Sequence, residues 1–277
     1  MITGKTLLIA HLGYPTEAFK APMIYNPWFE RQGIDAVVVP MGVKPADYPA
    51  ALAALASVTN LRGALVTMPH KLATLSLADE VTPTARIAGA CNALLRRPDG
   101  SLLGEQFDGA GFVRGVQRKG RQLAGARVLV AGCGGVGSAI AASLAAAGVA
   151  EIDLFDSHAE SAEALRDRLL HHYPRLRVGT GSKDPEGCDV VVNATPLGMQ
   201  DGDPLPFEVE RISPQALVGE VVMSSEYTPL LRAAKARGCQ VQVGTDMLFE
   251  MIPAYLEFFG FGSATADELR AVAQISY

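Results

Sequence analysis

The stretch that decides the fold runs from Val128 to Ser138 and reads Val-Leu-Val-Ala-Gly-Cys-Gly-Gly-Val-Gly-Ser. A buried-strand pattern leads here directly into glycines and then into an alanine-rich helix pattern. Gly132, Gly134 and Gly137 fit the spacing G-x-G-x-x-G. In a dinucleotide site the first glycine makes the tight turn, the second lets the backbone approach a pyrophosphate, and the third lets the helix pack closely on the strand. The sequence therefore predicts a Rossmann unit whose helix-start amides face the phosphates.

The next strand pattern, Glu151–Phe155, is followed by an acidic residue, Asp156. It lies roughly 20 residues beyond the glycines, where a carboxylate accepts a hydrogen bond from a ribose 2′-hydroxyl. A carboxylate there repels a 2′-phosphate, and no arginine immediately follows the strand to attract one. We therefore expect NAD as the cofactor, with NADP less favoured. The predicted cofactor-binding residues of this region are Gly132, Gly134, Gly135, Val136, Gly137 and Asp156.

The composition argues against several classes of protein. The chain has 277 residues, of which 49% are hydrophobic and 19% charged, with a net charge of -5, which is typical of a compact α/β protein of one or two domains. Its basic residues are scattered and form no stripe that would follow a phosphate backbone, so no nucleic-acid partner is expected. The 4 cysteines show no C-x-x-C spacing, and we predict neither disulfides nor a metal.

An uncharged run from Val128 to Ala150 is long enough to span a bilayer. Its glycines, however, divide it into a short β-branched strand and a separate Ala/Leu helix, which indicates a core packed on both faces of a sheet. The apolar stretch 7–10 is too short for the core of a signal peptide, and His11 and Gly13 interrupt it. We expect a cytoplasmic protein with no membrane partner.

Strand-like and helix-like segments alternate along both halves of the chain, as in sheets with crossover helices. In the first half, the predicted strands are 7–12, 36–40 and 63–67, and the predicted helices are 22–32 and 46–57. A helix and a boundary are expected within 112–125. In the second half, the predicted strands are 128–131, 152–155, 190–193, 217–222 and 240–243. From Met247 onward apolar residues recur at helical spacing, and we expect this segment to return to the first half.

Five short motifs are spread through both halves. They read V-T-M-P-H-K at Val66–Lys71, G-A-C-N at Gly89–Asn92, F-D-G-A-G at Phe107–Gly111, N-A-T-P-L-G-M at Asn193–Met199 and T-P-L-L at Thr228–Leu231. In order and spacing they resemble the shikimate dehydrogenase family over nearly the whole chain. The resemblance implies two α/β domains facing across a cleft. The first, 1–114 with C-terminal helices at about 246–277, is a substrate-binding domain with a mixed sheet, and the second, 115–245, is a Rossmann NAD(P)-binding domain.

Lys71 and Asp108 are the predicted catalytic residues. Hydride transfer between a secondary alcohol and a nicotinamide ring requires that a proton leave the hydroxyl as the hydride leaves the carbon. A lysine beside a carboxylate can take this proton as the amine and return it as the ammonium on reduction, and the family counterparts of these two residues form the catalytic pair. We expect Lys71, at the end of a strand-and-turn segment, to transfer the proton. Asp108, in a glycine-flanked loop, is expected to hold the lysine and the hydroxyl, and the alternative is a surface salt bridge.

Other residues match family positions at the predicted site. Thr67 and Asn92 match positions that hydrogen-bond the substrate, although capping of their own turns is an alternative. The resemblance implies that Asn193, Thr195 and Met199 line the nicotinamide side of the cleft.

Two histidines lie near the predicted site residues. His70 precedes the catalytic lysine and is interpreted as structural. His11, at the end of the first predicted strand, faces either the cleft or a local hydrogen-bond partner, and the local partner is favoured.

Five positions depart from the polar pattern of the family. Its N-terminal signature has a Ser-x-Ser pair before a proline, whose hydroxyls hold the substrate carboxylate, whereas this chain reads Phe-Lys-Ala-Pro at 19–22. The residues predicted to line an altered pocket are Phe19, Ala21, Leu65, Met223 and Met251. Each lost charge-assisted contact is worth about 1.5–3 kcal/mol, so we expect shikimate and quinate to be poor substrates. Lys20 and Glu17 are the candidates for a new polar anchor.

The sequence therefore predicts an NAD(P)-dependent alcohol dehydrogenase of the shikimate dehydrogenase type. It would transfer a hydride between a cyclic secondary alcohol and its ketone, with a pocket altered from that for shikimate. The alternative is a non-catalytic ligand-sensing or regulatory module on the same fold, which fold alone does not exclude. The retained Lys71 and Asp108 favour the enzyme. The expected partner is a small-molecule substrate, and the expected state is a monomer or homodimer.

Overall fold

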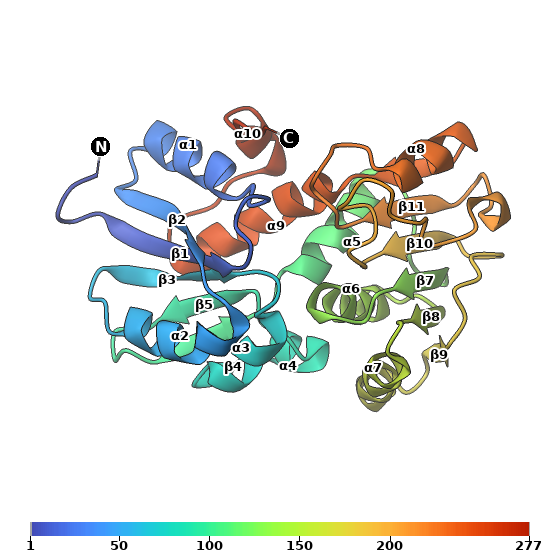
Figure 1. Cartoon of the computed structure of the whole chain (residues 1–277), viewed down its shortest axis with the longest axis horizontal. Helices are drawn as coiled ribbons and strands as arrows, with labels where there is room; N and C mark the ends of the chain where they lie inside the picture. The colour runs from blue at the N-terminus through green and yellow to red at the C-terminus, as the bar shows by residue number, and fades with distance from the viewer. Residues whose placement is uncertain (1, 277) are drawn as a thin grey trace. The chain divides into compact units, whose positions relative to one another are not determined.

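The computed structural model describes residues 2–276 and divides into two compact units. Unit 1 comprises residues 2–107 and 251–276, and unit 2 comprises residues 108–250. Each unit is built on its own six-stranded sheet with helices packed on it (Figure 1). The predicted fold class is confirmed: one α/β unit has a mixed sheet and the other has a Rossmann sheet.

The sheet of unit 1 has the strand order β2-β1-β3-β5-β6-β4. Its first three strands are parallel, whereas β5 runs antiparallel to both β3 and β6. The strands are β1 (Leu7–Gly13), β2 (Ala36–Gly42), β3 (Leu61–Val66), β4 (Glu80–Val81), β5 (Ala93–Arg96) and β6 (Leu102–Glu105). The helices are α1 (Pro22–Gln32), α2 (Tyr48–Ala56), α3 (Lys71–Leu77), α4 (Pro83–Ala88) and α10 (Ala266–Arg270).

Strand β1 lies between β2 and β3 and leads to predicted site residues of unit 1. Its residues from Ile9 onward are buried, as expected for a parallel strand covered on both faces. On one face, Ala10 and Leu12 pack in a cluster with Tyr48 and Leu52 of α2. Because β1 and β3 are parallel, the chain segments that follow both strands emerge at the same edge of the sheet.

The sheet of unit 2 has the order β12-β11-β10-β7-β8-β9, and the register of each neighbouring pair is parallel. The strands are β7 (Arg127–Ala131), β8 (Glu151–Phe155), β9 (Arg177–Thr180), β10 (Val190–Asn193), β11 (Leu217–Glu220) and β12 (Gln240–Gln242). The helices are α5 (Asp108–Arg118), α6 (Gly135–Ala146), α7 (Ala159–His172) and α8 (Pro229–Ala236). The strand order reverses between β7 and β10, which is where such sheets bind ligands beyond their carboxyl ends.

Helix α9 (Gly244–Phe259) is divided between the units, since residues up to Glu250 belong to unit 2 and residues from Met251 to unit 1. The segment from Met251 therefore belongs to the first unit. The sequence-based boundary at residue 115 lies inside α5, all of which belongs to unit 2. A Cβ on Gly109 would lie 2.0 Å from the Ala139 carbonyl oxygen, so α5 packs tightly on α6 from its first turn.

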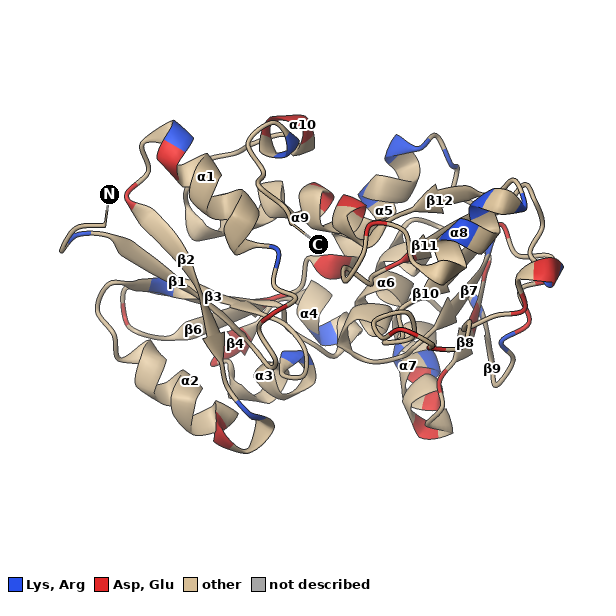
Figure 2. Cartoon of the chain, turned by 45° about the horizontal axis from the view of Figure 1, so that its top comes forward, with Lys and Arg blue, Asp and Glu red and all other residues tan. Residues whose placement is uncertain are grey.

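Charged residues are distributed over both units. Segments with Lys or Arg and segments with Asp or Glu both occur in each unit (Figure 2). Within residues 2–276, no helix combines the length and the apolar character that a membrane crossing requires. In the same range no three His, Cys, Asp or Glu side chains are grouped to hold a metal ion, and the cysteines Cys91, Cys133, Cys188 and Cys239 are buried free thiols.

Candidate active site

Lys71 is the first residue of helix α3, directly after the turn that follows β3. The prediction that it ends a strand-and-turn segment holds up to His70, but the helix begins at Lys71 itself. The turn is closed by the His70 amide, which donates to the Thr67 carbonyl at 2.9 Å. The Lys71 carbonyl accepts from the Cys91 amide at 2.9 Å, and the residue is only 8% exposed. A buried lysine at a fixed helix start is suited to acting on a bound group.

The Asn92 side chain has a hydrogen-bond partner at its amide oxygen but, among residues 2–276, none at its amide nitrogen. Its Oδ1 accepts from the Phe107 amide at 2.9 Å, and its carbonyl accepts from the Tyr255 hydroxyl at 3.0 Å. Its Nδ2 is buried without a hydrogen-bond partner among residues 2–276. The capping alternative therefore accounts for the acceptor of the amide, whereas the donor remains available for a ligand.

Asp108 is the first residue of α5 and is 1% exposed. The prediction of a loop at this position is wrong, because α5 begins at Asp108, and Gly109, which suggested a loop, allows α5 to lie close to α6. A carboxylate at a helix start is stabilised by the helix dipole. Lys71 thus belongs to unit 1 and Asp108 to unit 2, each at the first position of a helix.

Phe19 lies beside Thr67, at the edge formed by the ends of β1 and β3. A Cβ on Gly13 would lie 2.7 Å from Phe19 Cζ and 2.4 Å from Thr67 Cγ2. The Phe19 ring stacks on the His11 ring with centroids 4.1 Å apart. Leu65 is buried and pairs in register with His11 between β1 and β3. Two of the five apolar departures therefore cluster with a predicted substrate-binding threonine.

The other three departures take separate positions. Ala21 is buried immediately before α1 and gives that helix no side-chain cap. Met251 is 8% exposed on the part of α9 that belongs to unit 1. Met223 follows β11 in unit 2, is partly buried, and lies against Gly244, where a Cβ would be 3.1 Å from its Cγ.

The two candidates for a new polar anchor differ in their surroundings. The Lys20 ammonium donates a hydrogen bond to the Ser276 carbonyl, and burial lowers the pKa of this lysine. Glu17 is exposed. Lys20 thus ties the coil before α1 to the C-terminal segment of unit 1.

His11 differs from the histidine predicted to be structural. The His70 ring has a hydrogen-bond partner and a stacking partner in the fold. Its Nε2 lies 2.8 Å from the Val43 carbonyl oxygen, and its ring stacks on Tyr48 with centroids 3.9 Å apart. His11 is 7% exposed, and its Nδ1 has no hydrogen-bond partner in the described part of the chain. Burial and the nearby Lys71 lower its pKa to about 3, so the ring is neutral. The prediction of a local hydrogen-bond partner is wrong for this nitrogen.

The glycine loop of unit 2 has the geometry that its spacing predicted. Gly132 has a φ of 93°, which favours glycine, and a Cβ there would lie 2.6 Å from the Ala194 carbonyl carbon. A Cβ on Gly137 would lie 1.7 Å from the Gly132 oxygen, so strand and helix are in close contact. Gly134 precedes α6, is exposed, and has nothing within 4 Å of its Cβ position. Gly135 and Val136 form the first turn of α6, where free amides attract phosphate.

Asp156 follows β8 and is held against the glycine loop. Its Oδ2 accepts from the Cys133 amide at 2.7 Å, and its Oδ1 accepts from the His158 amide at 2.9 Å. Its side chain is 16% exposed. Each carboxylate oxygen accepts up to two hydrogen bonds, so the carboxylate is oriented by the backbone and retains capacity for a ribose diol.

The loop after β10 is organised by Asn193. Its Oδ1 accepts from the Thr195 amide at 3.1 Å and hydroxyl at 2.6 Å, and its Nδ2 donates to the Leu197 carbonyl at 3.0 Å. The partly exposed Met199 closes a turn by donating its amide to the Pro196 carbonyl at 3.0 Å. These contacts fix the shape of the loop that the resemblance assigns to the nicotinamide side.

Glu220, which sequence reasoning missed, lies fully buried beside Asn193 in the β10–β11 register. Its Oε2 accepts from the Thr228 hydroxyl at 2.9 Å. Burial raises its pKa to about 7, against the opposing effect of hydrogen bonds from Thr228 and Asn193. The signal in the sequence was a single acidic residue inside the apolar strand pattern 217–222.

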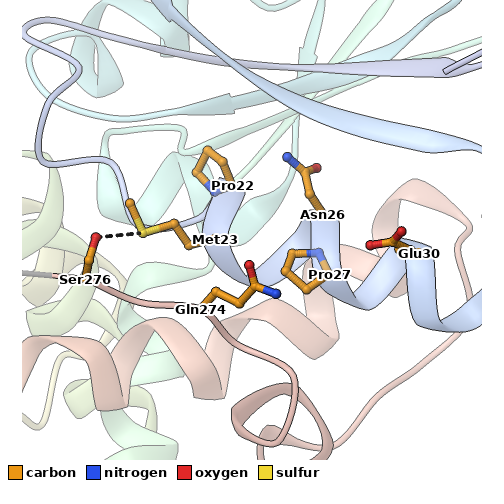
Figure 3. Close-up of a pocket in the computed structure, with 7 residues that line it drawn as sticks. All are labelled: Pro22, Met23, Asn26, Pro27, Glu30, Gln274 and Ser276. Carbon is orange, nitrogen blue, oxygen red and sulfur yellow. Dashed lines mark hydrogen bonds between the residues drawn. The ribbon is translucent and has the colours of Figure 1, made fainter. Parts of the chain in front are cut away.

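Unit 1 also has a surface pocket next to the segment that carries Lys20 and Ala21. It has a volume of about 320 Å³ and is lined by α1 and the C-terminal segment (Figure 3). Its lining residues are Pro22, Met23, Asn26, Pro27, Glu30, Gln274 and Ser276. None of the predicted site residues is among them.

Comparisons with known proteins agree with the motifs. The family described as "Shikimate dehydrogenase substrate binding domain" matches residues 12–94, and the ThiF family matches residues 112–172. The shikimate dehydrogenase (NADP(+)) of Acidiphilium cryptum (strain JF-5) is 37% identical over 276 residues, which cover 99% of this chain and 98% of that relative.

Two solved structures extend the likeness to the fold. Shikimate 5-dehydrogenase from Listeria monocytogenes, in complex with shikimate and NAD, is 26% identical with a TM-score of 0.87, covering 98% of this chain and 97% of its own. The ligand-free 5-ketofructose reductase of Gluconobacter sp. strain CHM43 is 25% identical with a TM-score of 0.85, covering 98% of each chain. The resemblance predicted from the motifs is therefore confirmed across both units, and the chain belongs to the shikimate dehydrogenase family of oxidoreductases.

Proposed function

We propose that the protein transfers a hydride between a cyclic secondary alcohol and its ketone, with NAD as the cofactor and a substrate pocket altered from that for shikimate. The observation that carries the proposal is the neighbourhood of Lys71. This buried lysine begins α3 after the turn that holds Thr67, and the Cys91 amide next to Asn92 donates to its carbonyl. The Asn92 Nδ2 donor is open to a ligand. These are the residue types that hold and deprotonate a hydroxyl.

The protein's own side chains are assigned to the proton transfer of the reaction. A bound nicotinamide would supply the hydride acceptor when the alcohol is oxidised. In that direction Lys71, as the neutral amine, would take the proton from the hydroxyl oxygen through Nζ and become an ammonium. Reduction of the ketone reverses both transfers. Asp108, the first residue of α5, is assigned to orient the lysine and the hydroxyl. Thr67 and Asn92 are assigned to position the ring of the substrate.

The preference for NAD rests on Asp156. Its carboxylate is held by two backbone amides beside the glycine loop, which suits a ribose diol and opposes a 2′-phosphate. The relatives include both kinds of cofactor user, since the Acidiphilium enzyme is named for NADP(+) and the Listeria structure contains NAD. Gly132, Gly134 and Gly137 supply the turn, the open approach and the close packing that a bound pyrophosphate requires.

The altered substrate pocket rests on Phe19 and Leu65. The Phe19 ring stacks on His11, and Leu65 pairs with His11 in the strand register, at the edge that also bears Thr67, so apolar groups occupy positions where the family has polar ones. A carboxylate buried without a partner is costly, which argues against shikimate in its usual pose. The likeness to a 5-ketofructose reductase supports a change of substrate on this fold.

A direct screen tests the proposal. Purified protein is supplied with NAD or NADP and with a panel of alicyclic alcohols and hydroxy acids that includes shikimate and quinate, and the appearance of reduced cofactor is measured. We expect turnover with NAD and with an alcohol other than shikimate. Turnover that is fastest with NADP and shikimate would contradict both the cofactor and the pocket assignments.

A further inference from the structure

His11 carries a buried polar atom that the fold of unit 1 does not use. The residue is 7% exposed, and its Nδ1 lacks a hydrogen-bond partner within residues 2–276. Leaving such a group unpaired is costly, so native structures rarely keep one without a reason. His70, the other buried histidine of this unit, shows that the fold can satisfy an imidazole, because its Nε2 lies 2.8 Å from the Val43 oxygen.

The surroundings of His11 are those of the altered pocket. Its ring stacks on Phe19 at 4.1 Å and 28°, and its backbone pairs in register with Leu65. The catalytic candidate Lys71 is close enough to disfavour a second positive charge on the imidazole. His11 therefore contacts two of the apolar departures and lies near the lysine assigned to the reacting hydroxyl.

The charge state of His11 limits what it can recognise. Burial and Lys71 lower the pKa of its imidazole to about 3, so the ring is neutral at physiological pH. A neutral imidazole donates one hydrogen bond and accepts another, but it does not neutralise a carboxylate. The Lys20 ammonium is hydrogen-bonded to the Ser276 carbonyl, and Lys71 must stand at the reacting hydroxyl if it is to move its proton.

We propose that His11 is a specificity residue that hydrogen-bonds an uncharged oxygen of the substrate, and that the substrate is accordingly a hydroxy ketone or polyol without a carboxylate at this position. The inference rests on the proposed function and names the substrate class of the same site. The substrate hydroxyl or carbonyl supplies the partner that Nδ1 lacks, while Phe19 holds the plane of the imidazole.

Three variants separate hydrogen bonding from packing. His11→Phe keeps an aromatic ring against Phe19 and removes both ring nitrogens, whereas His11→Asn keeps a polar atom near the position of Nδ1 and removes the ring. His70→Phe is the matched control, because it removes ring nitrogens from a buried, stacked histidine that has a hydrogen bond in the fold. The probes are shikimate and methyl shikimate, which differ in the charge of one group, and 5-ketofructose with NADH as an uncharged ketone.

We expect the wild-type protein to turn over at least one uncharged probe with a kcat/KM about 10-fold or more above that for shikimate. His11→Phe should lower this kcat/KM by about 10-fold, mainly through KM, as expected for the loss of one hydrogen bond in binding. His11→Asn should lower this kcat/KM less than His11→Phe does. In the absence of substrate, His11→Phe should leave the Tm unchanged or raise it, and His70→Phe should lower the Tm by about 2–4 °C.

The outcomes distinguish this inference from the proposed function. Faster turnover of shikimate than of both uncharged probes would leave the dehydrogenase function standing and overturn the inference. Failure of both uncharged probes would overturn the inference, and failure of every compound in the panel as well would overturn the proposed function. A Tm loss in His11→Phe as large as that in His70→Phe would overturn the inference whatever the kinetics, because it would show that the imidazole nitrogen supports the fold.

Discussion

At the scale of single residues, substitution of Lys71 and of Asp108 tests the proposed proton transfer. Lys71→Ala and Asp108→Asn should each lower kcat by at least roughly 100-fold, because a positioned acid–base group contributes about that much. Binding of NADH should change little, since the glycine loop and Asp156 are not altered. The measurement is steady-state turnover together with NADH fluorescence titration. Lys5→Ala, on an exposed lysine of the N-terminal segment, is the control, and near-normal activity in both site variants would contradict the assignment.

Asp156 is the residue that we expect to decide between cofactors. The wild-type protein should bind NADH more tightly than NADPH, because the fixed carboxylate accepts from a ribose diol and repels a phosphate. Asp156→Ser should reduce this preference by about 10-fold or more, as one charge-assisted contact is lost. Titration of both cofactors with both proteins gives the ratio directly. Glu160→Gln, an exposed carboxylate at the start of α7, is the control, and equal or tighter binding of NADPH by the wild type would refute the prediction.

At the scale of elements, Glu220 joins the end of β11 to the start of α8 through Thr228, and it lies beside Asn193 at the end of β10. Burial raises its pKa from the ordinary value of about 4.5 to about 7, so the folded protein binds this proton more tightly than the unfolded chain. Stability from this group is therefore lost as pH rises from about 4.5 to about 7, and it is constant above that.

Glu220→Gln should remove this pH-dependent loss of stability, because glutamine has no carboxyl group to titrate. Its amide oxygen can still accept from the Thr228 hydroxyl. Relative to wild type, the variant should gain stability as pH rises through that window, by up to about 3 kcal/mol. Urea unfolding at pH 5 and pH 8 measures the difference, and Glu160→Gln again serves as the exposed control. His11 has the opposite pH dependence, because its lowered pKa costs stability as pH falls below about 6.5. This contribution is the same in wild type and variant, so it cancels when their stabilities are compared. A pH-independent difference would rule out a raised pKa for Glu220.

The long elements were predictable because their patterns are local. The apolar run before Gly132 and the glycine spacing predict β7 and α6, and the chain folds this way. The four-residue strands β5 and β6 carry no periodicity of their own and form through pairing with β3 and each other. The helix starts at Lys71 and Asp108 were obscured by a proline and by glycines, which usually mark turns.

Some of the candidate site also depends on contacts between distant segments. The motifs predicted Lys71, Asp108 and Asp156, because the family resemblance is carried by short runs of sequence. The open Nδ1 of His11 and the buried carboxyl of Glu220 arise from tertiary burial that single residues do not reveal. The catalytic and binding roles themselves stay predictions that the variants above test.

At the scale of the whole molecule, the substrate range should be convertible. Phe19→Ser, Ala21→Ser and Leu65→Asn together should raise kcat/KM for shikimate, through KM and kcat, because the restored polar groups hold the carboxylate and orient the ring. Met223→Tyr and Met251→Gln complete the set if the triple variant gains little. Kinetics with shikimate measure the gain, and Phe261→Leu, in the C-terminal segment of unit 1, is a control for general loosening. Efficient shikimate oxidation by the unaltered protein would contradict the reading of these positions as a lost carboxylate site.

The division of α9 between the units has a consequence for how the chain matures during synthesis. Unit 2 is one uninterrupted segment, 108–250, whereas unit 1 needs residues 251–276 to be complete. The Tyr255 hydroxyl, which bonds the Asn92 carbonyl, and the fully buried Phe259 both come from that last segment. A ribosome therefore releases every residue of the second unit before it supplies the final helix of the first. Unit 1 therefore lacks part of its core until all of unit 2 has been synthesised.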